Sequence, residues 1–304
     1  MRPMLNRREH RIDMATTSEP ITNTIAVNGI RLAYHEWRCA LADDKPPLLF
    51  AHATGFHGRT FDAIAEAFPD RRVLSLDLRG HGRSEGEPIT HWRTVSDDVT
   101  AFLDQMQIKD AVGVGHSMGA HTLVQSAFER PGCFSKLVLF DPVILAPEFY
   151  APEAALFTSD APHPAIRRKR DFASPEAMIE RFASRDPYNL FDPRVFEDYC
   201  RYGLLPAEGG GFELACSPEM EASVYGASRS NSGIHDAARN LEVPTLVVRA
   251  KQSDIQDFKS SPTWPELASI MPHGTDCPRP DRTHFHPFED PADAARLIGE
   301  FAEG

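Results

Sequence analysis

The chain has 304 residues, of which 41% are hydrophobic and 25% are charged, and its formal net charge is −12. This composition is typical of an ordered globular protein. Because nucleic acids and anionic membranes attract basic surfaces, the acidic balance argues against both as partners and leaves a small-molecule substrate. The dense basic run Arg167–Arg170 predicts a solvated helix face, with contact to an acidic substrate or partner as the alternative.

Five scattered cysteines lack the paired spacings of a zinc site or a disulfide framework. We therefore expect free thiols, a reducing compartment and no metal ion. No cofactor is expected either. Residues 1–20 are polar and rich in Arg and Glu, so they lack the apolar core of a signal peptide, and no stretch reaches the length of a membrane span. These features predict a cytoplasmic protein with a flexible N-terminal tail over residues 1–20. A homo-oligomer is compatible with them.

Two β-type stretches open the expected domain. Residues 24–27 and 31–37 flank Asn28-Gly29, a dipeptide that favours the two-residue turn of a hairpin. Short apolar runs that indicate strands buried on both faces follow at residues 48–51, 73–76, 111–114, 137–140 and 246–248.

Helical patterns alternate with the first four of these runs. Phe61, Ile64, Ala65 and Phe68 recur at the spacing of one helix face, and the stretch from Val95 to Met106 does much the same. Alternating strands and helices predict an α/β fold with a mostly parallel sheet covered by helices on both faces.

About a hundred residues then separate two core strands, which predicts an inserted helical lid over residues 142–240 after the sixth strand. Ser174-Pro175, Asp192-Pro193 and Ser217-Pro218 each offer an N-cap followed by proline at the first helical position. Aromatic residues gather in this segment and suit either an apolar wall over a pocket or the lid's own small core. The predicted core comprises residues 21–141 and 241–304, and Asp290-Pro291 begins its last helix.

Gly115-His116-Ser117-Met118-Gly119 lies between an apolar run and a helix-like segment, so Ser117 is placed where a strand turns sharply into a helix. This context indicates a nucleophile elbow, in which flanking glycines let neighbouring backbone pass close to an exposed hydroxyl. A serine hydroxyl needs a base to take its proton, and the base needs a third group to orient it.

The base and the acid are expected downstream of Ser117, at later strand ends. His284 precedes the last helix and is the expected base, in preference to His286. Asp254 follows the strand at 246–248 and is the expected acid. Asp141, at the end of the run 137–140, is the alternative acid.

Acyl transfer also needs backbone N–H donors for the developing oxyanion. Met118 is expected to supply one, because it follows the nucleophile. Thr54, in the small-residue loop after residues 48–51, is expected to supply the other. The side chains of Phe56, His57 and His116 are expected to shape the substrate pocket.

Together these motifs resemble the α/β-hydrolase superfamily, in particular its lidded serine esterase-like members, from about Asn28 to Phe301. Asp77-Leu78-Arg79-Gly80-His81-Gly82-Arg83-Ser84 is similar to a loop of these proteins, and the resemblance implies that this loop is mainly structural. The sequence departs from relatives at Ala53, where they commonly show glycine, and at Ala250 with Ser253-Asp254, which replaces their glycine-led acid turn.

Since a fold hosts many reactions, function rests on the site. A serine nucleophile disfavours dehalogenase and epoxide hydrolase chemistry, for which the resemblance implies an aspartate. The expected activity is hydrolysis of carboxylic esters of a small, largely apolar substrate through an acyl-enzyme. The alternatives are lactone hydrolysis, carbon-carbon cleavage of a diketone, cofactor-free chemistry on the same fold, and a non-catalytic ligand receptor.

Overall fold

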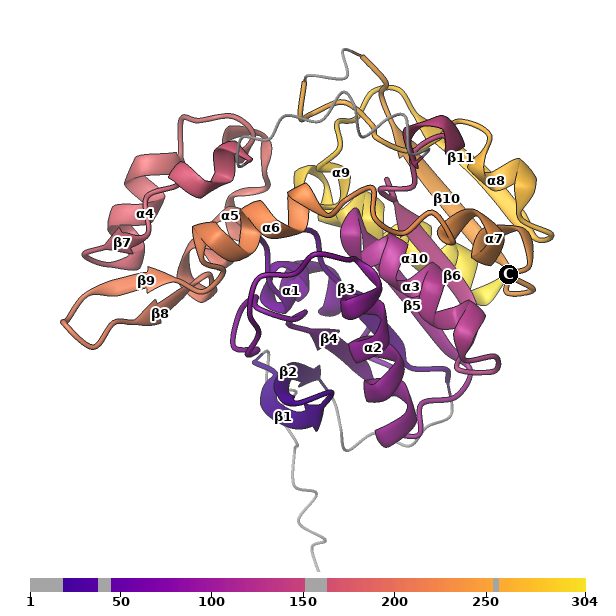
Figure 1. Ribbon diagram of the computed structural model, residues 1–304, viewed down its shortest axis with the longest axis horizontal. Helices are drawn as coiled ribbons and strands as arrows, with labels where there is room; N and C mark the ends of the chain where they lie inside the picture. Colours follow the sequence, from indigo (N-terminus) through magenta and orange to yellow (C-terminus); the bar gives the residue numbers. More distant parts are fainter. Residues whose placement is uncertain (1–18, 38–44, 151–162, 254–256) are drawn as a thin grey trace, which may run out of the picture.

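The computed structural model describes residues 19–37, 45–150, 163–253 and 257–304 (Figure 1). The expected tail lies almost entirely outside these ranges, and Asp254 also lies outside them. An eight-stranded sheet has the order β1-β2-β4-β3-β5-β6-β10-β11. Its strands are β1 (Ile21–Val27), β2 (Ile30–Trp37), β3 (Leu48–Ala51), β4 (Val73–Leu76), β5 (Ala111–His116), β6 (Phe134–Phe140), β10 (Thr245–Ala250) and β11 (Gly274–Arg279).

The first two strands form the predicted hairpin. β1 and β2 pair antiparallel around Asn28 and Gly29, which both have positive φ, 45° and 80°. Two central residues with positive φ are the mark of a type I′ turn, whose twist matches that of the flanking strands. β2 then pairs antiparallel with β4, whereas β4, β3, β5, β6, β10 and β11 run parallel.

Helices cover both faces of the sheet, as the alternating pattern predicts (Figure 1). One buried cluster joins the sheet to α2 (Arg93–Gln105), α3 (Met118–Glu129), α7 (Ile234–Arg239) and α8 (Leu267–Ile270). The other joins it to η1 (Gly58–Phe61), α1 (Asp62–Ala65), α9 (His286–Glu289) and α10 (Pro291–Glu303). The sheet is thus the middle of three layers, and its apolar strands are buried on both sides.

Residues between β6 and β10 form a long segment, which we call the insertion. Its helices α4, α5 and α6 begin at Pro175, Pro193 and Pro218, and each is capped by the side chain of the residue before the proline. Its elements are η2 (Pro147–Tyr150), η4 (Pro164–Arg167), β7 (Asp171–Phe172), α4 (Pro175–Phe182), η5 (Tyr188–Leu190), α5 (Pro193–Tyr202), β8 (Leu204–Pro206), β9 (Phe212–Leu214) and α6 (Pro218–Gly226), followed by α7. Its three short strands make a second sheet in the order β7-β9-β8. That this segment acts as a lid stays a prediction.

Charged and aromatic side chains join α5 of the insertion to η1 and α1 of the core. Arg194 forms two hydrogen bonds with Glu66, at 2.6 and 2.7 Å, and the Arg59 guanidinium lies 3.8 Å from the centroid of the Tyr202 ring. Asp198 is also at this contact, but its buried Oδ2 accepts no hydrogen bond from the described residues and is 3.8 Å from Arg194 Nε. Burial, and then the charge of Asp62, raises the pKa of Asp198 to about 7.

We expect Asp198→Asn to stabilise the protein above neutral pH. When the pKa of a carboxyl group is higher in the folded state than its unfolded value near 4, the protein loses stability as pH rises between the two pKa values. The reason is that ionisation is disfavoured only in the folded state. The melting temperature should therefore rise by roughly 2–4 °C at pH 8 and stay unchanged at pH 4. Glu197→Gln, at an exposed neighbouring position, is the control; a gain of equal size at both pH values would contradict this account.

Within the described ranges, none of the helices combines the length and apolar content that crossing a bilayer requires. Four of the five cysteines lie in these ranges and all four are free thiols. Cys39 lies outside them.

Candidate active site

Ser117 occupies the sharp bend between β5 and α3. Its φ of 57° and ψ of −116° put it in a backbone conformation that costs a non-glycine residue about 1–3 kcal/mol. The bend is tight because Gly115 and Gly119 pack backbone against backbone: a Cβ on Gly119 would lie 2.1 Å from the Ala51 carbonyl oxygen. The glycines that flank the serine are therefore required by close approach, and they bring the bend against the end of β3.

The His284 imidazole bridges Ser117 and Asp141. Its Nε2 is 3.0 Å from Ser117 Oγ, and its Nδ1 is 2.6 Å from Asp141 Oδ2. A carboxylate accepts, so Nδ1 carries the proton, and Nε2 is left to accept the hydrogen bond that the Ser117 hydroxyl donates. The chain of hydrogen bonds runs from a hydroxyl through an imidazole to a carboxylate.

The carboxylate that contacts this imidazole belongs to the alternative candidate for the acid. Asp141, the alternative acid, contacts His284, while Asp254, the expected acid, lies outside the described residues. Asp141 directly follows β6, its φ is 47°, and its N–H continues the sheet ladder by donating to Val248 O at 2.7 Å. This backbone turns the carboxyl group toward the imidazole instead of along the chain.

Both oxygens of the Asp141 carboxylate are hydrogen-bonded, and the side chain is buried. Its Oδ1 accepts from the Ala250 N–H at 2.9 Å and from Ser261 Oγ at 2.5 Å, and lies 3.3 Å from Thr263 Oγ1, whose hydroxyl donates to the Pro142 carbonyl oxygen at 2.8 Å. Charge-assisted hydrogen bonds of this kind compensate an ionised carboxylate for the loss of water. Sequence reasoning missed Ser261, because nothing in a lone hydroxyl residue marks it as the partner of a distant carboxyl.

The two predicted oxyanion donors lie next to each other beside the serine. Thr54 Oγ1 is 3.6 Å from Met118 Sδ, and both residues are buried. Within the described part of the chain, neither main-chain N–H donates to an acceptor. Ala53 to Phe56 form a turn closed by a Phe56 N–H to Ala53 O hydrogen bond of 3.2 Å, and Gly55 in it has a φ of 79°. Positive φ at this third position is the mark of a type II turn.

A cavity of about 1090 Å³ opens on this group and is lined by Thr54, Ser117 and His284. Core and insertion both contribute to its wall. Among the described residues, the aromatic part of the wall consists of Phe56, Trp92, Phe149, Phe182, Tyr188, Tyr199, Tyr225, Phe258, Trp264 and Phe285. Some aromatic residues of the insertion thus line the cavity, whereas Phe191 packs in a buried hydrophobic cluster. Phe157 lies outside the described residues.

Of the three expected pocket side chains, only Phe56 lines the cavity. His116 is buried behind His284, and its Nε2 donates to the His284 carbonyl oxygen at 2.8 Å. His57 is buried against α5, where Nε2 donates to the Tyr199 carbonyl oxygen at 3.1 Å. Burial lowers the pKa of His57 to about 4 and that of His116 well below 6.5, so both are neutral near pH 7. His116 adjoins Ser117 in the sequence and His57 is close to Thr54, yet neither side chain lines the cavity.

The structure also places His286, the alternative to His284 as the base, and Arg168 of the basic run. His286 Nε2 donates to Asp293 Oδ2 on α10 at 2.8 Å, away from the serine. Arg168, within the basic run, is not on a solvated face: it lines the cavity, pairs with Glu221 and donates to the Tyr199 hydroxyl at 2.9 Å. No three His, Cys, Asp or Glu side chains of the described ranges converge so as to hold a metal ion.

The parallel sheet and the serine bend with its imidazole and carboxylate define the α/β-hydrolase class of protein. The chain belongs to the alpha/beta hydrolase family, whose model matches residues 48–297.

Named relatives and a solved structure agree with this membership. The chain is 25% identical over 266 residues to the sn-1-specific diacylglycerol lipase ABHD11 of Danio rerio, covering 86% of this chain and 79% of that protein. It is 26% identical over 240 residues to the 2-(acetamidomethylene)succinate hydrolase of Mesorhizobium japonicum, covering 76% and 81%. The crystal structure of an E-2-(acetamidomethylene)succinate hydrolase superposes with a TM-score of 0.72 at 20% identity, covering 94% of this chain and 100% of that one.

Proposed function

We propose that the protein is a serine hydrolase that cleaves carboxylic esters of a small, largely apolar substrate through an acyl-enzyme. Ser117 is the nucleophile, His284 the base and Asp141 the acid. The supporting observation is the hydrogen-bonded series from Ser117 Oγ to His284 at 3.0 Å and on to Asp141 at 2.6 Å, at the wall of a cavity rich in aromatic side chains. The names of the two relatives, a lipase and a hydrolase, agree with this class of reaction.

The reaction follows from the roles of these groups. As Ser117 Oγ attacks the ester carbonyl carbon, its proton passes to His284 Nε2, and Asp141 stabilises the imidazolium. The negative charge on the carbonyl oxygen is taken by the Thr54 and Met118 N–H groups, and Met118 lies at the N-terminus of α3, where the helix dipole adds to the effect. The alcohol leaves with the proton held on Nε2. Water then attacks the acyl-enzyme. His284 takes the proton of the water and passes it to Ser117 Oγ as the carboxylic acid product leaves.

A substrate screen tests this proposal. Nitrophenyl esters of graded acyl length, lactones and diketones are supplied to the protein, and a fluorophosphonate probe is mapped by mass spectrometry. We expect ester turnover and addition of the probe to the single peptide that carries Ser117. Carbon-carbon cleavage without ester turnover would replace the proposed reaction by the diketone alternative. Tight ligand binding without any turnover or labelling would favour a receptor.

A further inference from the structure

The peptide unit between Ala53 and Thr54 is held by its carbonyl oxygen. Ala53 O accepts from His52 Nδ1 at 2.7 Å and from the Phe56 N–H at 3.2 Å. This peptide is trans, so its N–H, which belongs to Thr54, points away from the oxygen that the two donors fix. The orientation of one proposed oxyanion donor is therefore set by hydrogen bonds to the opposite side of its peptide unit.

The hydrogen bond from His52 has a defined direction. Leu78 N–H points at His52 Nε2 at 2.9 Å, and a main-chain N–H can only donate, so Nε2 must be the unprotonated nitrogen. Nδ1 consequently carries the proton and donates it to Ala53 O. Burial, and then the neighbouring His81, lowers the pKa of His52 well below 6.5, which keeps this neutral form near pH 7.

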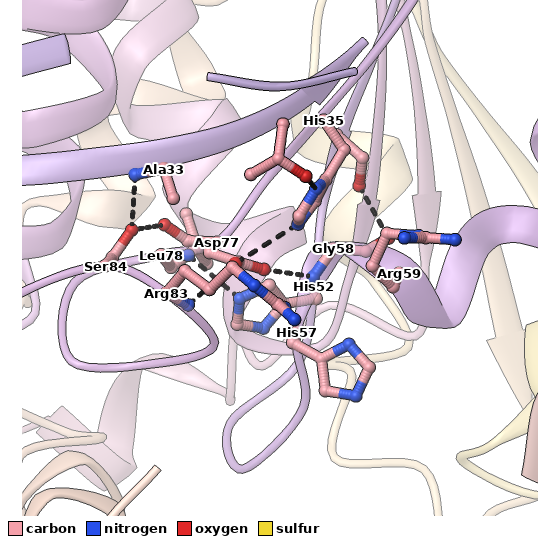
Figure 2. A network of polar contacts seen from close by, with 12 residues as sticks. Ala33, His35, His52, His57, Gly58, Arg59, Asp77, Leu78, Arg83 and Ser84 are labelled. Carbon is pink, nitrogen blue, oxygen red and sulfur yellow. Dashed lines mark hydrogen bonds and ion pairs between the residues drawn. The ribbon is translucent and has the colours of Figure 1, made fainter. Parts of the chain in front are cut away.

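Asp77, the neighbour of Leu78, holds the far end of the same loop. Its Oδ1 accepts from the Gly58 N–H at 2.7 Å, while its Oδ2 accepts from the Arg83 N–H at 2.8 Å and is 3.2 Å from His35 Nε2 (Figure 2). Figure 2 shows Asp77 at the centre of these contacts, with His52 reaching the adjacent Leu78. The loop from residue 52 to residue 58 is thus fixed at both ends by the turn that follows β4.

We propose that His52 is a positioning residue, whose Nδ1–H orients the Ala53–Thr54 peptide so that the Thr54 N–H faces the oxyanion formed at Ser117. This inference rests on the proposed function. The sequence resemblance implies that the loop containing Asp77 and Leu78 is mainly structural, whereas the contacts give Leu78 a specific role, because its N–H selects the protonated nitrogen of His52. Removing an oxyanion donor typically costs roughly 10²–10³-fold in kcat, so misdirecting one should give a loss near the lower figure.

Two substitutions separate the two hydrogen bonds of His52. An asparagine amide can occupy the place of Nδ1, so His52→Asn keeps the donor to Ala53 O and loses the acceptor for Leu78. A glutamine oxygen can reach the place of Nε2, so His52→Gln keeps that acceptor and loses the donor. Each variant loses one buried hydrogen bond, and the two melting temperatures should fall by similar amounts. His81→Gln is the matched control, because His81 is buried and its Nδ1 bonds to the Arg79 carbonyl oxygen at 2.8 Å.

With a nitrophenyl ester, we expect His52→Gln to lower kcat by roughly 100-fold while KM changes by less than about threefold. Affinity for a trifluoromethyl ketone, which adds to the serine and forms an oxyanion, should fall by a similar factor. His52→Asn and His81→Gln should keep kcat within about fivefold of the wild type, since both leave the Ala53 O contact in place. Equal kcat in the two His52 variants would overturn the inference, as would a loss in His52→Gln no larger than in the control.

The Thr54 amide resonance of 15N-labelled protein gives the same comparison without turnover. It should move in His52→Gln and stay near its wild-type position in His52→Asn and His81→Gln. A Thr54 resonance that is unchanged in His52→Gln would overturn the inference even if the protein is an esterase. If the Thr54 resonance moves in His52→Gln although the wild-type protein hydrolyses no ester, the positioning role holds and only the proposed reaction is refuted.

Discussion

Ser117→Ala is expected to lower ester turnover by roughly 10⁴–10⁶-fold and to abolish fluorophosphonate labelling, because no other hydroxyl of the described residues can take the place of Oγ beside His284 Nε2. Turnover of a nitrophenyl ester and the mass of the labelled peptide are the measurements. The residual rate over water would come from the oxyanion donors and from binding in the cavity.

Ser126→Ala supplies the control for this substitution. Ser126 is a buried serine in α3, the helix that Ser117 precedes, and its hydroxyl donates to the Ser96 carbonyl oxygen at 3.1 Å. This variant should lose some stability and little activity. If Ser117→Ala keeps most of the rate on the best substrate of the screen, an acyl-enzyme is the wrong mechanism, and cofactor-free chemistry on His284 becomes the better account.

Asp141→Asn is expected to cost about 10⁴-fold in kcat, the loss typical of a triad acid. The Ala250 N–H and the Ser261 hydroxyl donate to Asp141 Oδ1, so an asparagine would keep its oxygen there and turn its NH₂ group toward His284. The imidazole would then have to accept at Nδ1 and carry its proton on Nε2. In that tautomer it cannot take the proton of Ser117.

Asp254→Asn is the matched comparison, because Asp254 is the acid that the sequence favoured. We expect its kcat to stay within about tenfold of the wild type, well short of the loss at a triad acid. Rates for both variants should be measured with the same ester and compared with the melting temperatures. A larger loss at Asp254 than at Asp141 would refute the assignment of Asp141.

The fold was predictable where packing leaves a strong local signal. Apolar runs such as those at 48–51 and 111–114 become central strands, because strands buried on both faces need apolar side chains throughout. The strand β11 was missed: its sequence Gly-Thr-Asp-Cys-Pro-Arg is polar and contains a proline. It lies at the edge of the sheet, paired only with β10 among the described strands, where one side needs no partner and proline is tolerated.

The site was predictable as far as a bend and a strand end can be read from sequence. Ser117 and His284 were singled out by their positions, and the structure brings them within hydrogen-bond distance. Asp141 and Asp254 could not be separated in this way, because β6 and β10 are neighbours and both residues follow strands that end at the same edge of the sheet. Asp141 is marked by its positive φ and by two distant donors, the Ala250 N–H and the Ser261 hydroxyl, which sequence spacing does not encode.

The ion pair of Arg168, which follows η4, and Glu221 of α6 joins two parts of the insertion at the wall of the cavity. Both side chains are packed on the turn at Gly55, where an added Cβ would lie 2.8 Å from Glu221 Oε1 and 3.4 Å from Arg168 Nη1. Separating a buried ion pair costs about 3–5 kcal/mol when one charge is left without its partner. The pair therefore holds two segments of the insertion together beside Gly55, whereas Phe258, which also lines the cavity, is 54% exposed.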